Sequence, residues 1–246
     1  MGILIKYSYV ERIGNRMAIN LKRTSTIAAD GVKVLVYGQA GAGKTCLIPS
    51  LPNPVILSAE GGLLSIAGTD IPYVEIGCMK DLDEAYKWLV GSKEAGEFQS
   101  VALDSISEIA EVVLSAEKKT QKDGRAAYGA MGEQMTDLIR AFRDLPGKHV
   151  YFSAKLEKAQ DEMGRILYAP SMPGNKVGQQ LPYFFDEVLA LRVEKDNEGV
   201  PQRMLMCIPD GIWTAKDRSG ALDQWEAPDL GGVIAKIGGA ANAQPF

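Results

Sequence analysis

The sequence predicts an α/β fold, with a mostly parallel central sheet, flanking helices and an antiparallel C-terminal edge. Short apolar runs alternate with helix-like segments from Lys33 onward, a pattern typical of parallel sheets with crossover helices. A glycine-rich loop directly follows the first apolar run, where a strand would pass into a helix. Near the C-terminus, two apolar runs flank the turn-forming residues 196–199, as expected of an antiparallel pair.

The individual elements follow from their residue patterns. The alternating part comprises, in order, 34–37 (strand), 44–50 (helix), 55–57 (strand), 73–76 (strand), 81–94 (helix), 101–103 (strand) and 106–118 (helix). A further helix presents an apolar face made of Met131, Met135, Leu138, Ile139 and Phe142. Residues 149–153 form a buried strand, and the polar segment 155–180 is expected to be a long loop. The antiparallel pair is 187–193 with 203–208.

The chain divides into an arm, a core and a tail. Residues 1–31 carry basic side chains without a clear apolar period and are expected to form an N-terminal arm. The core spans 32–237, and the small, polar residues 238–246 predict a disordered tail. The chain has 246 residues, of which 46% are hydrophobic, so it can bury one substantial core. The sequence does not decide whether translation starts at Met1 or at Met17.

Composition limits the classes of function. No apolar run approaches the ~20 residues of a membrane span, and the N-terminus lacks the pattern of a signal peptide, so we expect a cytoplasmic protein without membrane contact. The three cysteines, Cys46, Cys78 and Cys207, are widely spaced, which argues against a disulfide framework or a zinc cluster. Because the net charge is −4, contact with nucleic acid would need local basic patches.

The glycine-rich loop has the full spacing of a phosphate-binding loop. Its glycines let successive N–H groups point at the β-phosphate of a nucleoside triphosphate, and Lys44 would contact the β- and γ-oxygens. The hydroxyl of Thr45 would ligate Mg²⁺ at the start of the next helix. The predicted binding residues are Gly38, Gln39, Ala40, Gly41, Ala42, Gly43, Lys44, Thr45 and Cys46.

Two carboxylates would complete this site. Asp104 follows a buried strand that we expect beside the phosphate-loop strand, where it would hold Mg²⁺ through water. It could instead cap the helix that begins at Ile106, a job that Ser105 could share. Glu60 follows the second strand at the same edge of the sheet and is the candidate that orients or deprotonates the attacking water. The alternative is that Glu60 is a solvated loop charge.

The order of these features resembles that of RecA-like recombinases. A phosphate loop is followed by a strand ending in Ser58-Ala59-Glu60, a strand ending at Asp104, and a later strand that enters a long segment. From about Val32 to Ile237 the chain resembles the short RecA-like ATPases of bacteriophages, often labelled phage nucleotide-binding proteins, which include core-only single-strand annealing and recombination proteins. This resemblance implies ATP and Mg²⁺ as cofactors, single-stranded DNA as a partner, the host cytoplasm as location and Glu60 as the catalytic glutamate.

The resemblance also implies two DNA-binding loops, near residues 118–131 and 156–180. Basic residues with a nearby tyrosine occur in both segments and could contact phosphates while stacking a base. Acidic residues dilute both patches, so a merely solvated charged surface remains the alternative. The candidate DNA-binding residues are Lys118, Lys119, Lys122 and Arg125 in the first segment, and Lys158, Arg165 and Lys176 in the second.

Lys216 and Arg218 alternate along the segment 212–220, so on an extended strand they would point to one side. In RecA-like filaments and hexameric replicative helicases, a similar Lys-x-Arg element reaches into the neighbouring subunit's site. The resemblance thus implies a homo-oligomer in which these residues act in trans on the γ-phosphate. The alternative is a surface pair flanking the turn at Ser219-Gly220. Lys155 departs from the family, which usually carries a γ-phosphate-sensing glutamine there: either Lys155 takes that part as a cation or the coupling is weak.

The expected function is that of an ATP-hydrolysing protein that anneals or pairs single-stranded DNA in phage recombination, with a host single-strand-binding protein as a family-based partner. Three alternatives remain open: a helicase-type DNA motor or loader, a small-molecule phosphotransferase, and a non-catalytic nucleotide-binding module. A phosphotransferase would need a lid with clustered arginines, whereas residues 119–125 offer mostly lysines.

Overall fold

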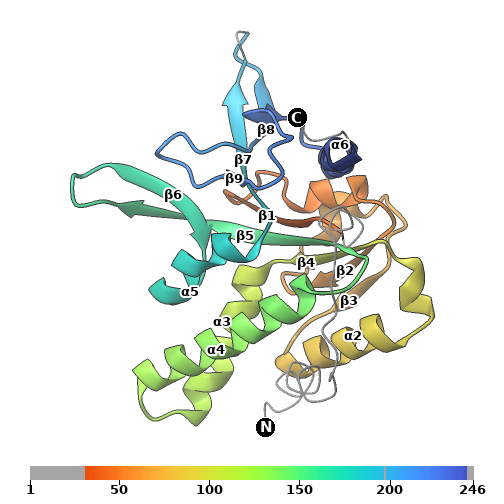
Figure 1. Ribbon diagram of the computed structural model, residues 1–246. Helices are drawn as coiled ribbons and strands as arrows, with labels where there is room; N and C mark the ends of the chain where they lie inside the picture. Colours follow the sequence, from red (N-terminus) through yellow and green to blue (C-terminus); the bar gives the residue numbers. More distant parts are fainter. Residues whose placement is uncertain (1–30, 197, 243–246) are drawn as a thin grey trace, which may run out of the picture.

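The computed structural model describes residues 31–196 and 198–242, so nearly all of the expected N-terminal arm lies outside the described residues. The described residues form a ten-stranded sheet with helices on both faces (Figure 1). The parallel strands are β1 (Lys33–Gly38), β2 (Pro54–Ser58), β3 (Tyr73–Glu75), β4 (Ser100–Asp104), β5 (His149–Gln160) and β7 (Glu187–Lys195). The antiparallel ones are β6 (Ile166–Ser171), β8 (Pro201–Met206), β9 (Lys216–Asp217) and β10 (Trp225–Glu226).

The strand order is β10-β8-β7-β1-β5-β4-β2-β3, with β6 paired to β5 and β9 paired to β7. The predicted α/β fold, a mostly parallel sheet with an antiparallel C-terminal edge, is therefore confirmed. One detail of the prediction is wrong: β4 does not lie beside the phosphate-loop strand, because β5 lies between them. Strand order depends on contacts between distant parts of the chain, which the local pattern of the sequence does not encode.

Both faces of the sheet are covered by helices. The α-helices are α2 (Met79–Gly91), α3 (Ile106–Thr120), α4 (Gly124–Arg143), α5 (Asn175–Gln180) and α6 (Leu230–Asn242). Short 3-10 helices occur at η2 (Thr45–Ser50), η3 (Leu63–Ile66), η4 (Glu94–Glu97) and η5 (Leu181–Phe184). Within the described ranges, no helix is both long enough and apolar enough to cross a membrane.

The central strand β1 is apolar because it is buried on both faces. Leu35 and Tyr37 belong to the larger core, which also contains the apolar residues of α2, α3 and α4. Val34 and Val36 belong to the second core, against η2 and α6. The five apolar residues predicted to face the core from one helix are all 0% exposed in α4: Met131, Met135, Leu138, Ile139 and Phe142. Burial of both faces fixes β1, and with it the loop that leaves its carboxyl end.

Three other expectations need correction. The long loop expected over 155–180 is instead a β-hairpin formed by β5 and β6, followed by α5. The helix expected over 44–50 occurs at that place, but it is the 3-10 helix η2 with Pro49 inside it rather than an α-helix. The tail expected from Gly238 begins later, since α6 extends to Asn242, and 243–246 lie outside the described residues.

Candidate functional site

The phosphate loop leaves the carboxyl end of β1 and turns sharply before η2. Gly41 and Gly43 adopt φ angles of +75° and +102°, which residues with a Cβ rarely adopt. The ammonium group of Lys44 donates hydrogen bonds of 3.1 Å to the carbonyls of Gly38 and Gln39. Burial lowers the pKa of Lys44, while the nearby carboxylates of Glu60 and Asp104 act in the opposite direction. The lysine is therefore held at the mouth of the loop, where a phosphate would bind.

Thr45 and Asp104 meet beneath this loop. The hydroxyl of Thr45 donates to one carboxylate oxygen of Asp104 at 2.7 Å, and the hydroxyl of Ser153 on β5 donates to the other. Asp104 is only 2% exposed. A hydroxyl beside a buried carboxylate is the oxygen-rich set that suits Mg²⁺, so these residues fit the metal that a triphosphate site requires. Ser105, rather than Asp104, caps α3, since its hydroxyl accepts from the backbone N–H of Glu108 at 3.4 Å.

Glu60 lies at the same edge of the sheet. It is exposed and follows β2, whose last residue pairs in register with Asp104. The hydroxyl of Ser105 donates to its carboxylate, and its charge acts on Lys44. The structure thus brings Lys44, Thr45, Asp104 and Glu60 together, whereas their roles in catalysis stay predictions.

Three side chains that sequence reasoning missed support this site. Ser153 orients Asp104, as described above. The hydroxyl of Tyr151 donates to the carbonyl of Lys44 at 2.9 Å. The guanidinium of Arg203 on β8 donates through Nε to the carbonyl of Ala42 at 2.9 Å. The sequence gives no local signal for these contacts, because each joins the loop or Asp104 to a strand far along the chain.

Lys155 lies directly beside the phosphate loop. It is opposite Gly38 in the parallel register of β1 and β5, and its ammonium contacts Glu108 on α3 at 2.5 Å. This contact is the main cause that raises the pKa of Lys155, so the side chain stays charged at neutral pH. Lys155 also influences Lys44 electrostatically. Lys155, where RecA-like recombinases usually carry a glutamine, therefore lies beside the phosphate loop.

A second hollow adjoins the outer turn of the loop. A cavity of about 400 Å³ lies between residues 39–42 and residues 191–194, with Trp213 in its lining. The guanidinium of Arg192 lies 4.8 Å from the ring of Trp213 and 5.1 Å from that of Trp225. Tyr168 stacks on Trp213 at 4.2 Å, so this aromatic cluster fixes the wall beside the loop.

Lys216 and Arg218 contact groups of their own chain. The ammonium of Lys216 donates to the carbonyls of Phe185 at 2.6 Å and Pro182 at 3.2 Å. Arg218 pairs with Asp186 at 2.8 Å, and its side chain is 55% exposed. Of the two predicted trans-acting residues, Arg218 is thus the more accessible.

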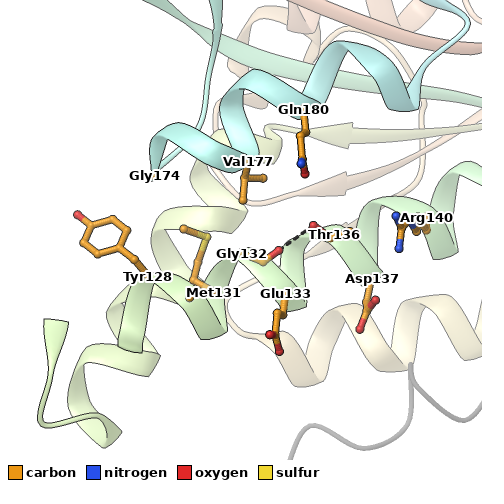
Figure 2. A pocket seen from close by; sticks show the side chains of 11 residues that line it. Tyr128, Met131, Gly132, Glu133, Thr136, Asp137, Arg140, Gly174, Val177 and Gln180 are labelled. Carbon is orange, nitrogen blue, oxygen red and sulfur yellow. Dashed lines mark hydrogen bonds between the residues drawn. The ribbon is translucent and has the colours of Figure 1, made fainter. Parts of the chain in front are cut away.

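The first set of candidate DNA-binding residues lies at the tip where α3 meets α4. Lys118, Lys119, Lys122 and Arg125 are all exposed there. The ammonium of Lys118 lies 5.3 Å from the centre of the Tyr128 ring. Tyr128 also borders a groove of about 800 Å³ between α4 and α5 (Figure 2). Glu133 and Asp137 line this groove, so the basic tip suits a phosphate backbone better than the groove does.

The second set of candidate DNA-binding residues lies on the β5–β6 hairpin and α5. Lys158 is exposed on β5. Arg165 is also exposed but pairs with Asp161 at 2.7 Å, which reduces its availability to phosphates. Lys176 falls within α5, but its side chain lies outside the description. Figure 1 shows the hairpin and the α3–α4 tip projecting on the same side of the molecule, with α5 between them.

Comparison with known proteins identifies the family. No curated protein matches the chain. A solved structure of a KaiC-like protein from the hyperthermophilic archaeon Pyrococcus horikoshii is 14% identical, with a TM-score of 0.42 over 72% of this chain and 79% of that one. A likeness this weak says nothing about activity. Residues 30–219 match the family described as AAA domain. Because this match covers well over half of the chain and includes the phosphate loop, the protein belongs to the AAA-domain family and is a P-loop NTPase.

Proposed function

We propose that this protein is a RecA-like ATPase of phage origin that binds single-stranded DNA and promotes annealing or strand pairing, with ATP hydrolysed at a subunit interface. The observation that carries the proposal is the convergence of Lys44, Thr45, Asp104 and Glu60 at one edge of the sheet. The family match alone would support nucleotide binding but would not indicate which residues hydrolyse ATP.

The four residues divide the chemistry of hydrolysis between them. The loop N–H groups and Lys44 would hold the phosphates, and Thr45 with Asp104 would hold Mg²⁺, which would neutralise part of the phosphate charge. Glu60, held by Ser105, orients a water molecule for in-line attack on the γ-phosphorus and accepts its proton. The bond from the γ-phosphorus to the β-bridging oxygen breaks, and ADP leaves with its electron pair.

Two projecting elements support the DNA part of the proposal. The α3–α4 tip combines four exposed basic residues with Tyr128, and the β5–β6 hairpin carries Lys158. Such surfaces bind a single strand without sequence preference, through phosphates and base stacking. The hairpin begins beside the phosphate loop at Lys155, so DNA bound there would lie on an element continuous with the ATP site.

A neighbouring subunit would complete the ATP site. Arg218 is exposed and directly follows β9, and its only competing partner among the described ion pairs is Asp186. In an oligomer, a γ-phosphate of the neighbour would compete with Asp186 for this guanidinium.

The test is the steady-state ATP hydrolysis rate with and without single-stranded DNA, repeated over a salt series. We expect DNA to stimulate hydrolysis at low salt and the stimulation to fade as salt rises, because phosphate contacts release counterions. Hydrolysis that ignores DNA at low salt would refute the recombination role. Directional unwinding of a duplex would instead favour a helicase-type motor.

A further inference from the structure

Arg203 connects the antiparallel edge of the sheet to the phosphate loop. It lies on β8, opposite Val193 of β7, and its side chain reaches back to the loop. Nε donates to the carbonyl of Ala42 at 2.9 Å. A Cβ added to Gly43 would lie 3.1 Å from the same nitrogen, so the guanidinium end of the arginine packs against this glycine. A charged donor therefore contacts the peptide bond between Ala42 and Gly43.

This peptide bond lies where the loop must present its N–H groups. In a trans peptide the carbonyl oxygen and the following N–H point to opposite sides of the chain. Because the carbonyl of Ala42 points toward Arg203 on β8, the N–H of Gly43 points to the opposite side of the loop. Inward N–H groups are what a phosphate-binding loop needs.

No other contact described for the loop fixes the orientation of the Ala42–Gly43 peptide plane. The side chain of Ala42 is 3% exposed and packs in the second core, which fixes its Cα but not the plane of the next peptide. Gly43 has a φ of +102° and no side chain, so its backbone rotates more freely than that of other residues. Two residues further on, the carbonyl of Lys44 is held by Tyr151 and by the N–H of Leu47. Arg203 supplies the corresponding contact for Ala42.

We propose that Arg203 is a positioning residue of the nucleotide site, which holds the Ala42–Gly43 peptide so that the N–H of Gly43 faces the β-phosphate. The inference rests on the nucleotide-binding part of the proposed function and is independent of DNA. It adds a residue from the antiparallel strand β8 to the residues that parallel strands and their loops bring to the site. The contacts of Arg203 that support this role are with the backbone of the loop.

This role predicts equal effects on ATP and ADP, because both carry the β-phosphate. In Arg203→Ala, we expect the affinity for ADP and for a non-hydrolysable ATP analogue to fall by about tenfold each, as for the loss of a charge-assisted hydrogen bond. Arg203→Lys and Arg203→Gln each keep an N–H donor on a flexible chain and should retain part of this affinity. Gln202→Ala, at the exposed neighbouring position of the same strand, is the matched control and should bind both nucleotides normally.

The experiment is calorimetric titration of the full-length variants with each nucleotide, together with hydrogen exchange of the loop N–H groups. Arg203→Ala should speed exchange at 41–44 while its melting temperature stays close to that of Gln202→Ala. Unchanged affinity for both nucleotides would overturn the proposal. A loss confined to the ATP analogue would also overturn it, because the guanidinium would then act on the γ-phosphate. A wild-type protein that binds both nucleotides but shows no DNA-stimulated hydrolysis would refute the recombination role and leave this inference standing.

Discussion

At Lys44, the ammonium group donates to carbonyls of the loop itself, and burial has already removed part of its hydration. Glu60 lies outside the loop and contacts only Ser105 among the described hydrogen bonds. We therefore expect Lys44→Ala to lose triphosphate binding, whereas Glu60→Gln should bind normally but hydrolyse at least about a hundredfold more slowly, as for the loss of a general base. The measurements are nucleotide affinity and steady-state turnover of each variant. Normal turnover in both variants would refute the assignment of the site.

Ser153 tests whether the carboxylate of Asp104 must be held in place for Mg²⁺ to bind. Its hydroxyl donates to Asp104 in a fully buried setting. In Ser153→Ala, we expect the concentration of Mg²⁺ needed for half-maximal hydrolysis to rise about tenfold, since partners of metal-holding groups typically contribute this much. Ser100→Ala is the control, because Ser100 is as buried as Ser153 but lies at the other end of β4 from Asp104, where it donates to the carbonyl of Pro52. An equal shift in both variants would mean that the effect is general destabilisation.

The sequence identified the four residues that the structure brings together beside the phosphate loop, but not the residues that hold them in place. Lys44, Thr45, Asp104 and Glu60 stand at the ends of apolar strands or in the glycine-rich loop, so a local pattern marks each one. Ser153 instead needs β5 to lie between β1 and β4 before it can reach Asp104. That arrangement arises from long-range packing, which one sequence without its fold does not specify.

Among the elements, the β5–β6 hairpin shows how a strand can escape prediction. From Lys155 to Gln160, β5 is mostly exposed. Its residues therefore do not alternate between a buried apolar face and an exposed polar face. Only pairing with β6 makes this stretch a strand, as the register from Lys155 opposite Ser171 to Gln160 opposite Ile166 demonstrates. The periodicity that identifies buried strands is therefore missing where the sheet projects into solvent.

The root of this hairpin allows the open question about Lys155 to be tested. Lys155 pairs with Glu108, while its backbone N–H donates to Ser107 at 2.9 Å and the hydroxyl of Ser107 donates to Ser171 on β6 at 2.7 Å. If the cation senses the γ-phosphate, Lys155→Met should weaken a non-hydrolysable ATP analogue about tenfold and leave ADP unaffected. Lys155→Arg should restore most of the difference. If the wild type, Lys155→Met and Lys155→Arg bind each nucleotide equally well, Lys155 does not sense the γ-phosphate. That result would favour weak coupling between the ATP site and the β5–β6 hairpin.

The pairing of β7 with β9 buries a carboxyl group that has a distinct pH signature. Glu187 is 1% exposed and lies opposite Asp217 in the register of β7 and β9. Burial, followed by the charge of Asp217 opposite it on β9, raises its pKa from 4.5 to about 8. Asp186 adds to the rise and Lys216 is the nearby cation. The side chain is therefore neutral in the folded protein at neutral pH.

The sign of the stability change follows from this shift. The unfolded chain releases the proton of Glu187 near pH 4.5, whereas the folded chain keeps it until about pH 8. The contribution of this group to stability is thus complete below pH 4.5 and declines as pH rises to about 8. The urea concentration at the midpoint of unfolding should therefore fall as pH rises between these two values. In Glu187→Gln, whose side chain stays neutral, this fall should be smaller. Glu198→Gln, in the exposed turn, should keep the wild-type slope, and an identical slope in all three proteins would contradict the buried neutral carboxyl.

For the whole molecule, the open question is whether one chain can complete its own ATP site. Lys44 is at the mouth of the loop, while Arg218 pairs with Asp186 of its own chain and remains half exposed. If Arg218 acts on a neighbour, Lys44→Ala and Arg218→Ala subunits should each be inactive alone yet recover part of the hydrolysis when mixed. In mixed oligomers, an intact loop from one variant can meet an intact arginine from the other.

Asp186 supplies the control for this mixing experiment. In the wild type it competes with any neighbouring phosphate for Arg218, so Asp186→Asn should retain hydrolysis or raise it, provided that the arginine acts in trans. If Arg218 instead serves only the turn that follows β9, losing either partner of the pair should lower the melting temperature and leave turnover unchanged. Normal hydrolysis by Arg218→Ala alone would reject the trans role. Recovery in the mixture, combined with an active Asp186→Asn, would make the oligomer the functional unit, with each ATP bound by one chain and acted on by the next.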